Sequence, residues 1–327
     1  MRHSTQVNIA RTGVQISQLG LGTAPLAGLY TPVSDSESDE LVLACLENGI
    51  NYFDTAPMYG HGISELRLGR ILKNSTKPYV VQTKVGRVLN PTDNADRELF
   101  ANADLHLEPI FDYSADGIKR SIDESLQRLG IDHIDVALLH DPDDYLKEAI
   151  GVAYPVLDDL RRQGIIRGVG VGVNVTATAV TVMNECDLNI VLIAGRYTLL
   201  DQDAENALLP LALTKKVSVL AAGVYNSGVL ADPKPGATYD YLPASQEILD
   251  RARAISRFLN ERNVSLTAAA LQFPLRHPAV TAVLTGSRGK NELLANIHDF
   301  DTDLPENLWE ELESAGLIQK LARGESS

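Results

Sequence analysis

The chain has 327 residues, of which 44% are hydrophobic and 22% charged, as is ordinary for a soluble globular protein. Its formal net charge of −14 argues against nucleic acid or an anionic membrane as a partner, because such partners need clustered Lys and Arg. The first residues hold no apolar leader run, and no segment approaches the ~18 consecutive apolar residues of a membrane span. Cys45 and Cys186 lie far apart without metal-ligand spacing, so we expect buried free thiols, no metal and a cytoplasmic protein.

Short apolar strands and amphipathic helices alternate along the chain. The predicted strands cover residues 18–24, 51–56, 79–85, 134–140, 166–173, 189–195, 217–223 and 279–286. Most are continuous apolar runs, which is typical of parallel strands buried on both faces. Helical patterns lie between them; the one over 114–130 carries a single apolar stripe and stops at Gly130. This alternation predicts either a closed (β/α)8 barrel or a long doubly wound sheet.

Polar residues at the strand ends favour the barrel. Asp54, Lys84, His140 and Asn174 each fall at the C-terminal end of a predicted strand. In a parallel barrel those ends meet at one mouth, whereas an open sheet spreads them along an edge. A dinucleotide-binding Rossmann unit is weakly supported, because the glycines of residues 19–22 lead into a proline-containing loop and not into a helix. We predict an α/β fold, a single (β/α)8 TIM barrel that forms one domain over residues 1–327.

Four residues at this mouth suggest a catalytic site only when they are considered together. Singly, Asp54 suits a turn cap, Tyr59 a loop aromatic and His140 a satisfied strand-end histidine. A lysine ammonium beside a tyrosine stabilises the phenolate and draws its pKa down, and a carboxylate keeps that lysine charged and oriented. A histidine can hydrogen-bond the reacting oxygen. The set of Asp54, Tyr59, Lys84 and His140 suits proton transfer at an alcohol or carbonyl during hydride transfer with a nicotinamide.

The stretches that carry these residues resemble the catalytic tetrad of the aldo-keto reductases. They are FDTAPMYG with Asp54 and Tyr59, QTKVG with Lys84, and ALLHDPD with His140. The resemblance runs through nearly the whole chain and implies a (β/α)8 barrel, a nicotinamide cofactor and no metal. It makes Tyr59 the general acid in carbonyl reduction and the base in alcohol oxidation, tuned by Lys84 and Asp54, while His140 orients the substrate.

The same resemblance implies the cofactor-binding residues. Gly22, Thr23 and Asp54 would line the nicotinamide ribose, and Asn174 would hold the carboxamide. Residues 221–230 would follow the pyrophosphate, among them Tyr225, Asn226 and Ser227. The adenosine end would meet Gly286, Ser287, Arg288, Glu292 and Asn296.

Four positions depart from the family pattern. Val173, Ala194 and Ala222 stand where many members have a serine, a glutamine and an aromatic that help to hold the nicotinamide. Glu292 stands where members that use NADP have a basic residue for the 2′-phosphate. A carboxylate repels a phosphate and can accept hydrogen bonds from a free ribose hydroxyl, although Arg288 lies close by. We therefore expect NAD as the cofactor, with NADP less favoured.

The closest resemblance within the family is to the aldose and galactose 1-dehydrogenases and the pyridoxal dehydrogenase branch. It implies oxidation of a hemiacetal C1 hydroxyl to a lactone, on a sugar of the L-fucose, D-arabinose or L-galactose type. Pyridoxal 4-dehydrogenase activity that forms pyridoxolactone, a broad NADPH-dependent aldehyde or ketone reductase, and a cofactor-sensing regulatory subunit stay open as alternatives.

The substrate-binding candidates lie around the predicted mouth. The segment from Arg87 to Tyr113 exceeds an ordinary βα loop, and a substrate-covering role is expected for it. Besides His140, the candidates are Tyr30, Asp141, Phe111 and Tyr113, of which Phe111 and Tyr113 could stack on a sugar; His106 and Glu108 suit surface decoration equally well.

Overall fold

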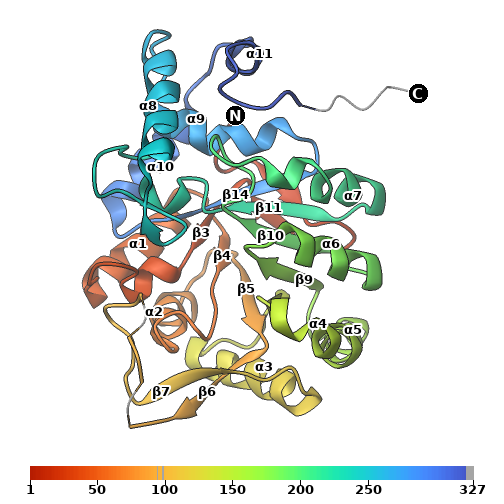
Figure 1. Ribbon diagram of the computed structural model, residues 1–327. Helices are drawn as coiled ribbons and strands as arrows, with labels where there is room; N and C mark the ends of the chain where they lie inside the picture. The colour runs from red at the N-terminus through yellow and green to blue at the C-terminus, as the bar shows by residue number, and fades with distance from the viewer. Residues whose placement is uncertain (94, 98, 322–327) are drawn as a thin grey trace.

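The computed structural model describes residues 1–93, 95–97 and 99–321. Eight parallel strands close into a barrel that helices surround (Figure 1). In order around the barrel they are β3 (Leu19–Gly22), β4 (Tyr52–Asp54), β5 (Val80–Val85), β8 (Val136–His140), β9 (Gly168–Val173), β10 (Ile190–Ala194), β11 (Ser218–Ala222) and β14 (Val280–Gly286). The predicted strands and the closed barrel are confirmed, and the open doubly wound sheet is excluded.

Several helices begin or end where their sequences provide caps. At the start of the first helix Ser34 and Glu37 form a reciprocal capping box, and the helix predicted to stop at Gly130 does so with Gly130 in the left-handed conformation. The helices are α1 (Asp35–Glu47), α2 (Ile63–Leu72), α3 (Ala115–Leu129), α4 (Leu146–Glu148), α5 (Tyr154–Arg162), α6 (Thr176–Glu185), α7 (Leu208–Lys215), α8 (Gln246–Asn260), α9 (Leu266–Gln272), α10 (Lys290–Asp301) and α11 (Leu308–Ser314), with a π-helical turn, η3 (Ala149–Ala153), between α4 and α5.

Two apolar clusters fill the molecule. One lies between the strands and the surrounding helices. The other occupies the barrel interior and includes Tyr52, Val80, Val136 and Leu138. Because side chains alternate along a strand, the residue two positions after Leu138 on β8, His140, faces the same interior at the C-terminal end. Asp54 follows Tyr52 in the same way on β4, and β5 presents Lys84 four residues after Val80. The barrel core therefore ends in a polar layer.

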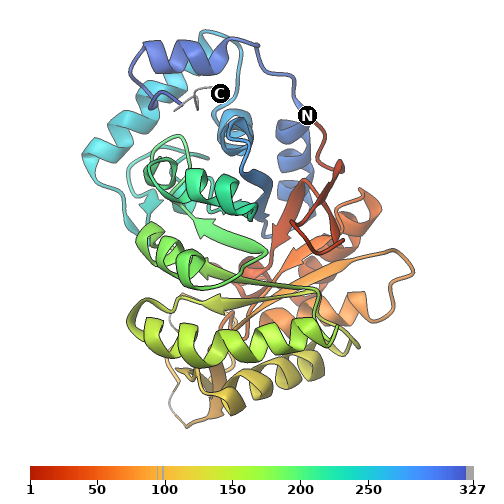
Figure 2. The same ribbon diagram turned by 90° about the vertical axis from the view of Figure 1, so that its right-hand side faces the viewer.

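A short N-terminal hairpin that the sequence did not reveal covers the opposite end of the barrel. Its strands are β1 (Gln6–Asn8) and β2 (Gln15–Ser17), and it appears in red on the right of Figure 2. Ile9, Val14 and Ile16 from this hairpin join the interior cluster. The hairpin thus closes the end of the barrel away from the polar layer.

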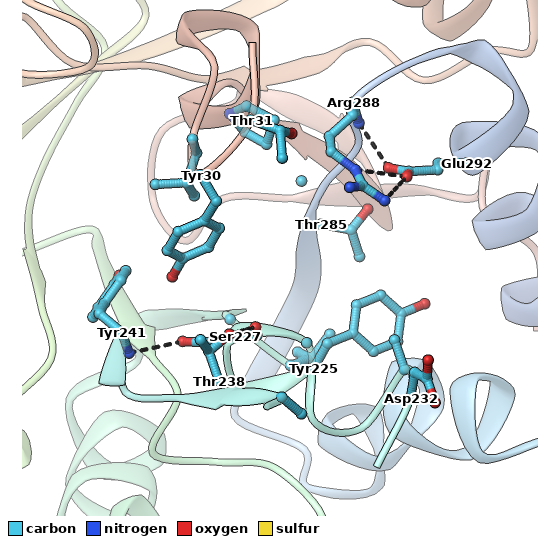
Figure 3. A pocket seen from close by; sticks show the side chains of 18 of the residues that line it. Tyr30, Thr31, Tyr225, Ser227, Asp232, Thr238, Tyr241, Thr285, Arg288 and Glu292 are labelled. Carbon is cyan, nitrogen blue, oxygen red and sulfur yellow. Dashed lines mark hydrogen bonds and ion pairs between the residues drawn. The ribbon is translucent and has the colours of Figure 1, made fainter. Parts of the chain in front are cut away.

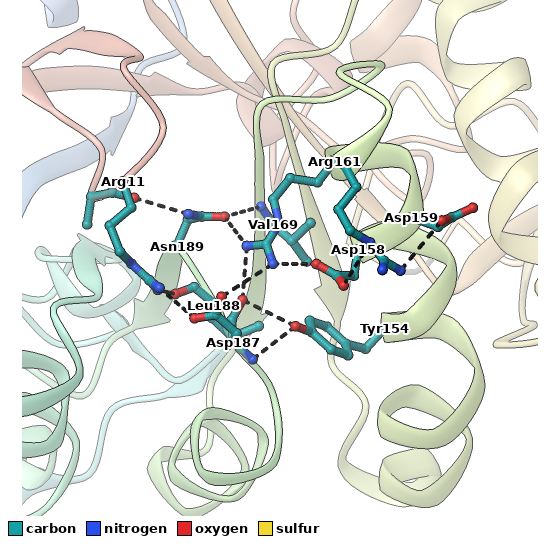
Figure 4. Close-up of polar contacts among 11 residues, drawn as sticks. Arg11, Tyr154, Asp158, Asp159, Arg161, Val169, Asp187, Leu188 and Asn189 are labelled. Carbon is teal, nitrogen blue, oxygen red and sulfur yellow. Dashed lines mark hydrogen bonds and ion pairs between the residues drawn. The ribbon is translucent and has the colours of Figure 1, made fainter.

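Asn189, directly before β10, anchors that hairpin to the barrel (Figure 4). Its amide nitrogen donates to the Ala10 carbonyl at 3.1 Å, and its side-chain oxygen accepts from the Val169 amide at 3.0 Å and from Arg161 at 2.7 Å. Arg11 of the turn pairs with Asp187 at 2.6 Å. In a (β/α)8 barrel this face serves stability, so we assign the network a structural role.

Two further hairpins flank the mouth. The segment expected to be a long loop contains β6 (Arg87–Pro91) and β7 (Leu107–Phe111), which pair antiparallel and lie at the bottom of Figure 1. The second hairpin joins β12 (Thr238–Tyr239) to β13 (Leu242–Pro243). Cys45 and Cys186 are free and buried, as expected.

Candidate active site

The structure brings Asp54, Lys84, Tyr59 and His140 together at the C-terminal mouth of the barrel. Lys84 Nζ is the centre of the arrangement: it donates to both carboxylate oxygens of Asp54 at 2.9 and 2.8 Å, to the Thr55 carbonyl at 2.9 Å and to Tyr59 Oη at 3.0 Å. Lys84 and Asp54 are almost fully buried, with side chains 2% and 5% exposed. The lysine hydrogen bond occupies an acceptor site of the phenol oxygen, so the Tyr59 proton is free to meet a ligand.

Burial dominates the acidity of Tyr59. Desolvation raises the pKa of Tyr59 above its usual value of 10.0, and the nearby Lys84 charge opposes this without overcoming it. Lys84 does lower the pKa of Tyr59, as expected, but burial raises it by more. The expectation that the pKa of Tyr59 lies below its usual value is therefore wrong. Although burial alone would lower it, the charges of Asp54 and Tyr59 raise the pKa of Lys84. At neutral pH the site holds an ammonium beside a neutral phenol.

His140 stands edge-on to Tyr59, with ring centroids 6.1 Å apart and an interplanar angle of 90°. Burial and, secondarily, the charges of Lys84 and Arg87 hold the pKa of His140 well below 6.5, so the ring is neutral at physiological pH. Its Nδ1 is buried without a hydrogen-bond partner among the described residues. The Tyr113 hydroxyl donates to the His140 carbonyl and fixes the backbone at this strand end.

Two supporting residues beneath the tetrad were missed by sequence reasoning. Gln82 donates to Asp54 Oδ1 at 2.7 Å and accepts from the Tyr52 hydroxyl at 2.7 Å, which holds the carboxylate in place from below. Gln82 lies two residues before Lys84 on β5, so strand alternation could have identified it. Gly172 lies beside the Lys84 side chain: a Cβ there would meet Leu138 Cδ1 at 3.3 Å and would stand in ordinary contact with Lys84 Cε at 3.5 Å.

A cavity of about 410 Å³ opens above the tetrad. Tyr59, Lys84, Asp54 and His140 form its polar floor together with Asp141 and Asn174. Its walls are largely apolar and aromatic, and they include Leu29, Met58, Leu99, Phe100, Val173, Leu192, Ala194, Ala222, Tyr241 and Leu284. Such a cavity suits a small molecule that is held by a few polar contacts.

A second cavity of about 490 Å³ adjoins the first (Figure 3). The two cavities share the lining residues Pro25, Leu29, Gly223, Tyr241, Leu284 and Gly286. Tyr30 and Thr31 lie on one side of the second cavity and Tyr225, Ser227 and Tyr241 on the other, with Arg288 and Glu292 at its far end (Figure 3). Together the cavities form an extended groove that ends over Tyr59.

Comparison with known proteins identifies this arrangement. Residues 18–316 match the model of the aldo/keto reductase family. The chain belongs to the aldo/keto reductase family. Its fold and its activity class, oxidoreductase, follow from that membership.

Two curated aldo/keto reductases are similar to the chain over nearly its whole length. Pyridoxal 4-dehydrogenase of Microbacterium luteolum is 39% identical, covering 97% of this chain and 99% of the relative. D-threo-aldose 1-dehydrogenase of Pseudomonas sp is 38% identical, with 96% and 98% covered. Among solved structures, a glycerol dehydrogenase from Gluconobacter oxydans superimposes with a TM-score of 0.76 at 23% identity, covering 95% of this chain and 94% of that one, which is a likeness of fold.

Aldo/keto reductases use nicotinamide cofactors, and the groove has the features that such a cofactor requires. Gly223 and Gly286 line both cavities and allow a ligand to approach the backbone closely. Thr285 lines the second cavity, and its buried hydroxyl has no partner among the described residues. The groove therefore fits an extended dinucleotide.

The residues expected at the cofactor fall into two groups. Those that line the groove are Gly22, Asp54, Asn174, Tyr225, Ser227, Gly286, Arg288 and Glu292. Those that lie behind it are Thr23, Asn226, Ser287 and Asn296, all buried. Asn296 accepts from the Tyr225 hydroxyl at 2.8 Å and donates to Ser287 at 3.1 Å, and Asn226 donates to the Gly195 carbonyl at 3.1 Å. The second group supports the lining.

The substrate-binding candidates separate in the same way. His140 and Asp141 line the catalytic cavity, whereas Tyr30 lines the second cavity. Phe111 and Tyr113 line neither; Phe111 lies under the Arg87 guanidinium at 4.3 Å, and Tyr113 is buried. We assign these two rings a supporting role in place of stacking on substrate. Leu99 and Phe100, which belong to the segment expected to cover the substrate, contribute to the wall. Tyr241 contributes as well; sequence reasoning missed it, because only tertiary packing brings it there.

Across the described residues, none of the helices is both long and apolar enough to cross a membrane, and no three His, Cys, Asp or Glu side chains group as a metal site.

Proposed function

We propose that the protein is an NAD-dependent dehydrogenase that oxidises the hemiacetal C1 hydroxyl of an aldose to its lactone. The buried Lys84 ammonium hydrogen-bonded to Tyr59 at the floor of the cavity carries this proposal. It is supported by the similarity to D-threo-aldose 1-dehydrogenase over nearly the full length. The same similarity to pyridoxal 4-dehydrogenase keeps a pyridoxal-type hemiacetal as the second candidate.

The chain's own residues account for the proton and for orientation. A bound nicotinamide supplies the hydride acceptor for C1. Tyr59, a neutral phenol at neutral pH, first gives its proton to solvent. The resulting phenolate, stabilised by the Lys84 hydrogen bond, then accepts the proton of the C1 hydroxyl. The Asp54 carboxylate keeps Lys84 charged and fixed. The neutral His140 ring hydrogen-bonds the reacting oxygen and orients it towards Tyr59.

A substrate screen tests the proposal. With NAD, the protein is expected to form NADH in the presence of L-fucose, D-arabinose or L-galactose, and pyridoxal is the comparison substrate. Lactone formation identifies the oxidised position. Inertness of every aldose at millimolar concentration would contradict the aldose proposal, and turnover of pyridoxal alone would replace it with the second candidate.

The preference for NAD rests on Glu292. Its Oε2 accepts from the Arg288 backbone amide at 2.8 Å, and its Oε1 accepts from Arg288 Nε at 2.8 Å, so the Arg288 guanidinium is already paired with a carboxylate. A 2′-phosphate would meet a carboxylate there instead of a free guanidinium.

Replacing Glu292 by Gln is expected to improve NADP binding by about tenfold or more relative to NAD, because it removes the repulsion and frees Arg288. Equilibrium titration of both cofactors measures the ratio. Glu185→Gln, on the exposed end of α6, is the control with the same change of net charge. An unchanged NADP to NAD ratio in Glu292→Gln would contradict this account of cofactor choice.

A further inference from the structure

The mouth of the barrel holds one more ionised pair beside the tetrad. Arg87 Nη2 donates to Asp141 Oδ2 at 2.9 Å, with side chains 15% and 26% exposed. Of the residues that line the catalytic cavity, the charged ones are Asp54, Lys84 and Asp141. Asp54 and Lys84 form an ion pair with each other below Tyr59. Asp141 is therefore the charged residue of this lining that does not belong to the tetrad.

The backbone turns the Asp141 carboxylate towards the cavity. Asp141 follows the last residue of β8 and adopts a left-handed conformation with φ of 46°, and its amide donates to the Gly172 carbonyl at 3.0 Å. A positive φ is unusual for a residue with a side chain and is more often tolerated by Asp and Asn than by most others. The strain and the Gly172 hydrogen bond fix the carboxylate beside His140, whose Nε2 lies 3.6 Å from Asp141 Oδ2.

Arg87 is held from behind by an aromatic stack. Its guanidinium carbon lies 4.3 Å from the centre of the Phe111 ring, and Phe111 stacks on Tyr145 at 4.7 Å. Arg87 and Phe111 are paired residues of the β6–β7 hairpin. Arg87 does not line the cavity, whereas Asp141 does, and the hydrogen bond from Arg87 engages one of the two carboxylate oxygens of Asp141.

We propose that Asp141, held by Arg87, binds the substrate hydroxyl on the carbon next to the reacting carbon, and so selects neutral hydroxylated hemiacetals. This inference rests on the proposed function. A carboxylate in a largely apolar cavity accepts hydrogen bonds from hydroxyls and repels anions, so sugar phosphates and sugar acids are excluded from the site. The short distance from Asp141 to His140, which orients the reacting oxygen, places the recognised hydroxyl on the adjacent carbon.

Combining changes in the protein with a change in the substrate tests whether Asp141 binds this hydroxyl. The wild-type protein and Asp141→Asn and Asp141→Ala variants are assayed with NAD on an aldose oxidised in the screen and on its 2-deoxy counterpart. The wild type is expected to prefer the parent sugar by about tenfold or more in kcat/KM, since an unmade hydrogen bond to a buried charged group is costly. In both variants the parent sugar loses this advantage, so that the parent and the 2-deoxy sugar are oxidised with similar kcat/KM.

A purely structural role predicts a different result. If Asp141 only maintained the fold, both sugars would lose efficiency by the same factor, and the proposal would be overturned; it would also be overturned if the wild type did not discriminate. Asp144→Asn, at an exposed position three residues along, is the matched control and is expected to keep the preference. Failure of the wild type to oxidise any aldose would instead refute the proposed function. In that case calorimetry measures the affinities of the two sugars for the NAD-saturated protein and tests the Asp141 inference independently of turnover. Equal affinities would overturn the inference.

Discussion

At the scale of single residues, the chemistry depends on a phenol whose proton is held tightly. Because the pKa of Tyr59 is raised by burial, oxidation requires the phenol to become an acceptor, and the rate is expected to rise with pH above neutrality. The pKa of His140 is lowered well below 6.5, so no activity limb is expected between about pH 6 and 8 from that ring.

Lys84→Met removes the charge that opposes the effect of burial on Tyr59. The pKa of Tyr59 then rises further, so the alkaline limb of the kcat/KM profile moves to higher pH, and the rate at neutral pH falls by about 10²-fold or more. Lys84→Arg keeps the charge, so its alkaline limb and its rate at neutral pH are expected to lie between those of the wild type and Lys84→Met. Circular dichroism and NAD titration separate this effect from misfolding. An unshifted limb in Lys84→Met would show that Tyr59 is not the titrating group.

The sequence was sufficient to predict that Asp54, Tyr59, Lys84 and His140 meet at the barrel mouth, and insufficient to predict the side chains that hold them. Asp54, Lys84 and His140 end apolar strands, and a parallel barrel must bring such ends together. The Arg87–Asp141 pair depends on how a hairpin folds back over the mouth, which strand periodicity does not encode. Phe111 and Tyr113 have the composition of a sugar-stacking surface, yet the pairing of β6 with β7 sets Phe111 under Arg87, and Tyr113 is buried.

At the scale of elements, the eight barrel strands were predictable because strands buried on both faces are continuous apolar runs. The hairpin β1–β2 was not, because its strands are short and largely polar and it is held by tertiary hydrogen bonds. The β6–β7 hairpin was hidden for a similar reason: its strands bury few residues and lack a sustained apolar alternation.

Asn189 offers a test of the hairpin's contribution. Asn189→Ala leaves the Val169 amide and the Ala10 carbonyl without this partner in a buried setting, and is expected to lower the free energy of unfolding by about 2 kcal/mol or more. Urea denaturation measures this. The exposed neighbour Asn184→Ala is the control and is expected to change stability by less than about 0.5 kcal/mol. Equal stability of the two variants would show that the network is dispensable.

At the scale of the whole molecule, the groove couples cofactor binding to stability. A ligand that binds only the folded state at 100 times its dissociation constant adds about 2.7 kcal/mol to the free energy of unfolding. NAD is therefore expected to raise the Tm more than an equal concentration of NADP, and Glu292→Gln is expected to narrow the difference. A larger shift with NADP for the wild-type protein would contradict the assignment of NAD.

The most direct test of the central claim is the rate of NADH formation by Tyr59→Phe on the aldose that the wild type oxidises best. This change removes one hydroxyl that accepts from Lys84 and leaves the groove lining intact. We expect kcat to fall by about 10²-fold or more, with NAD affinity nearly unchanged, because the proton acceptor is lost while the cofactor contacts stay. A variant that kept wild-type turnover would contradict proton transfer through Tyr59.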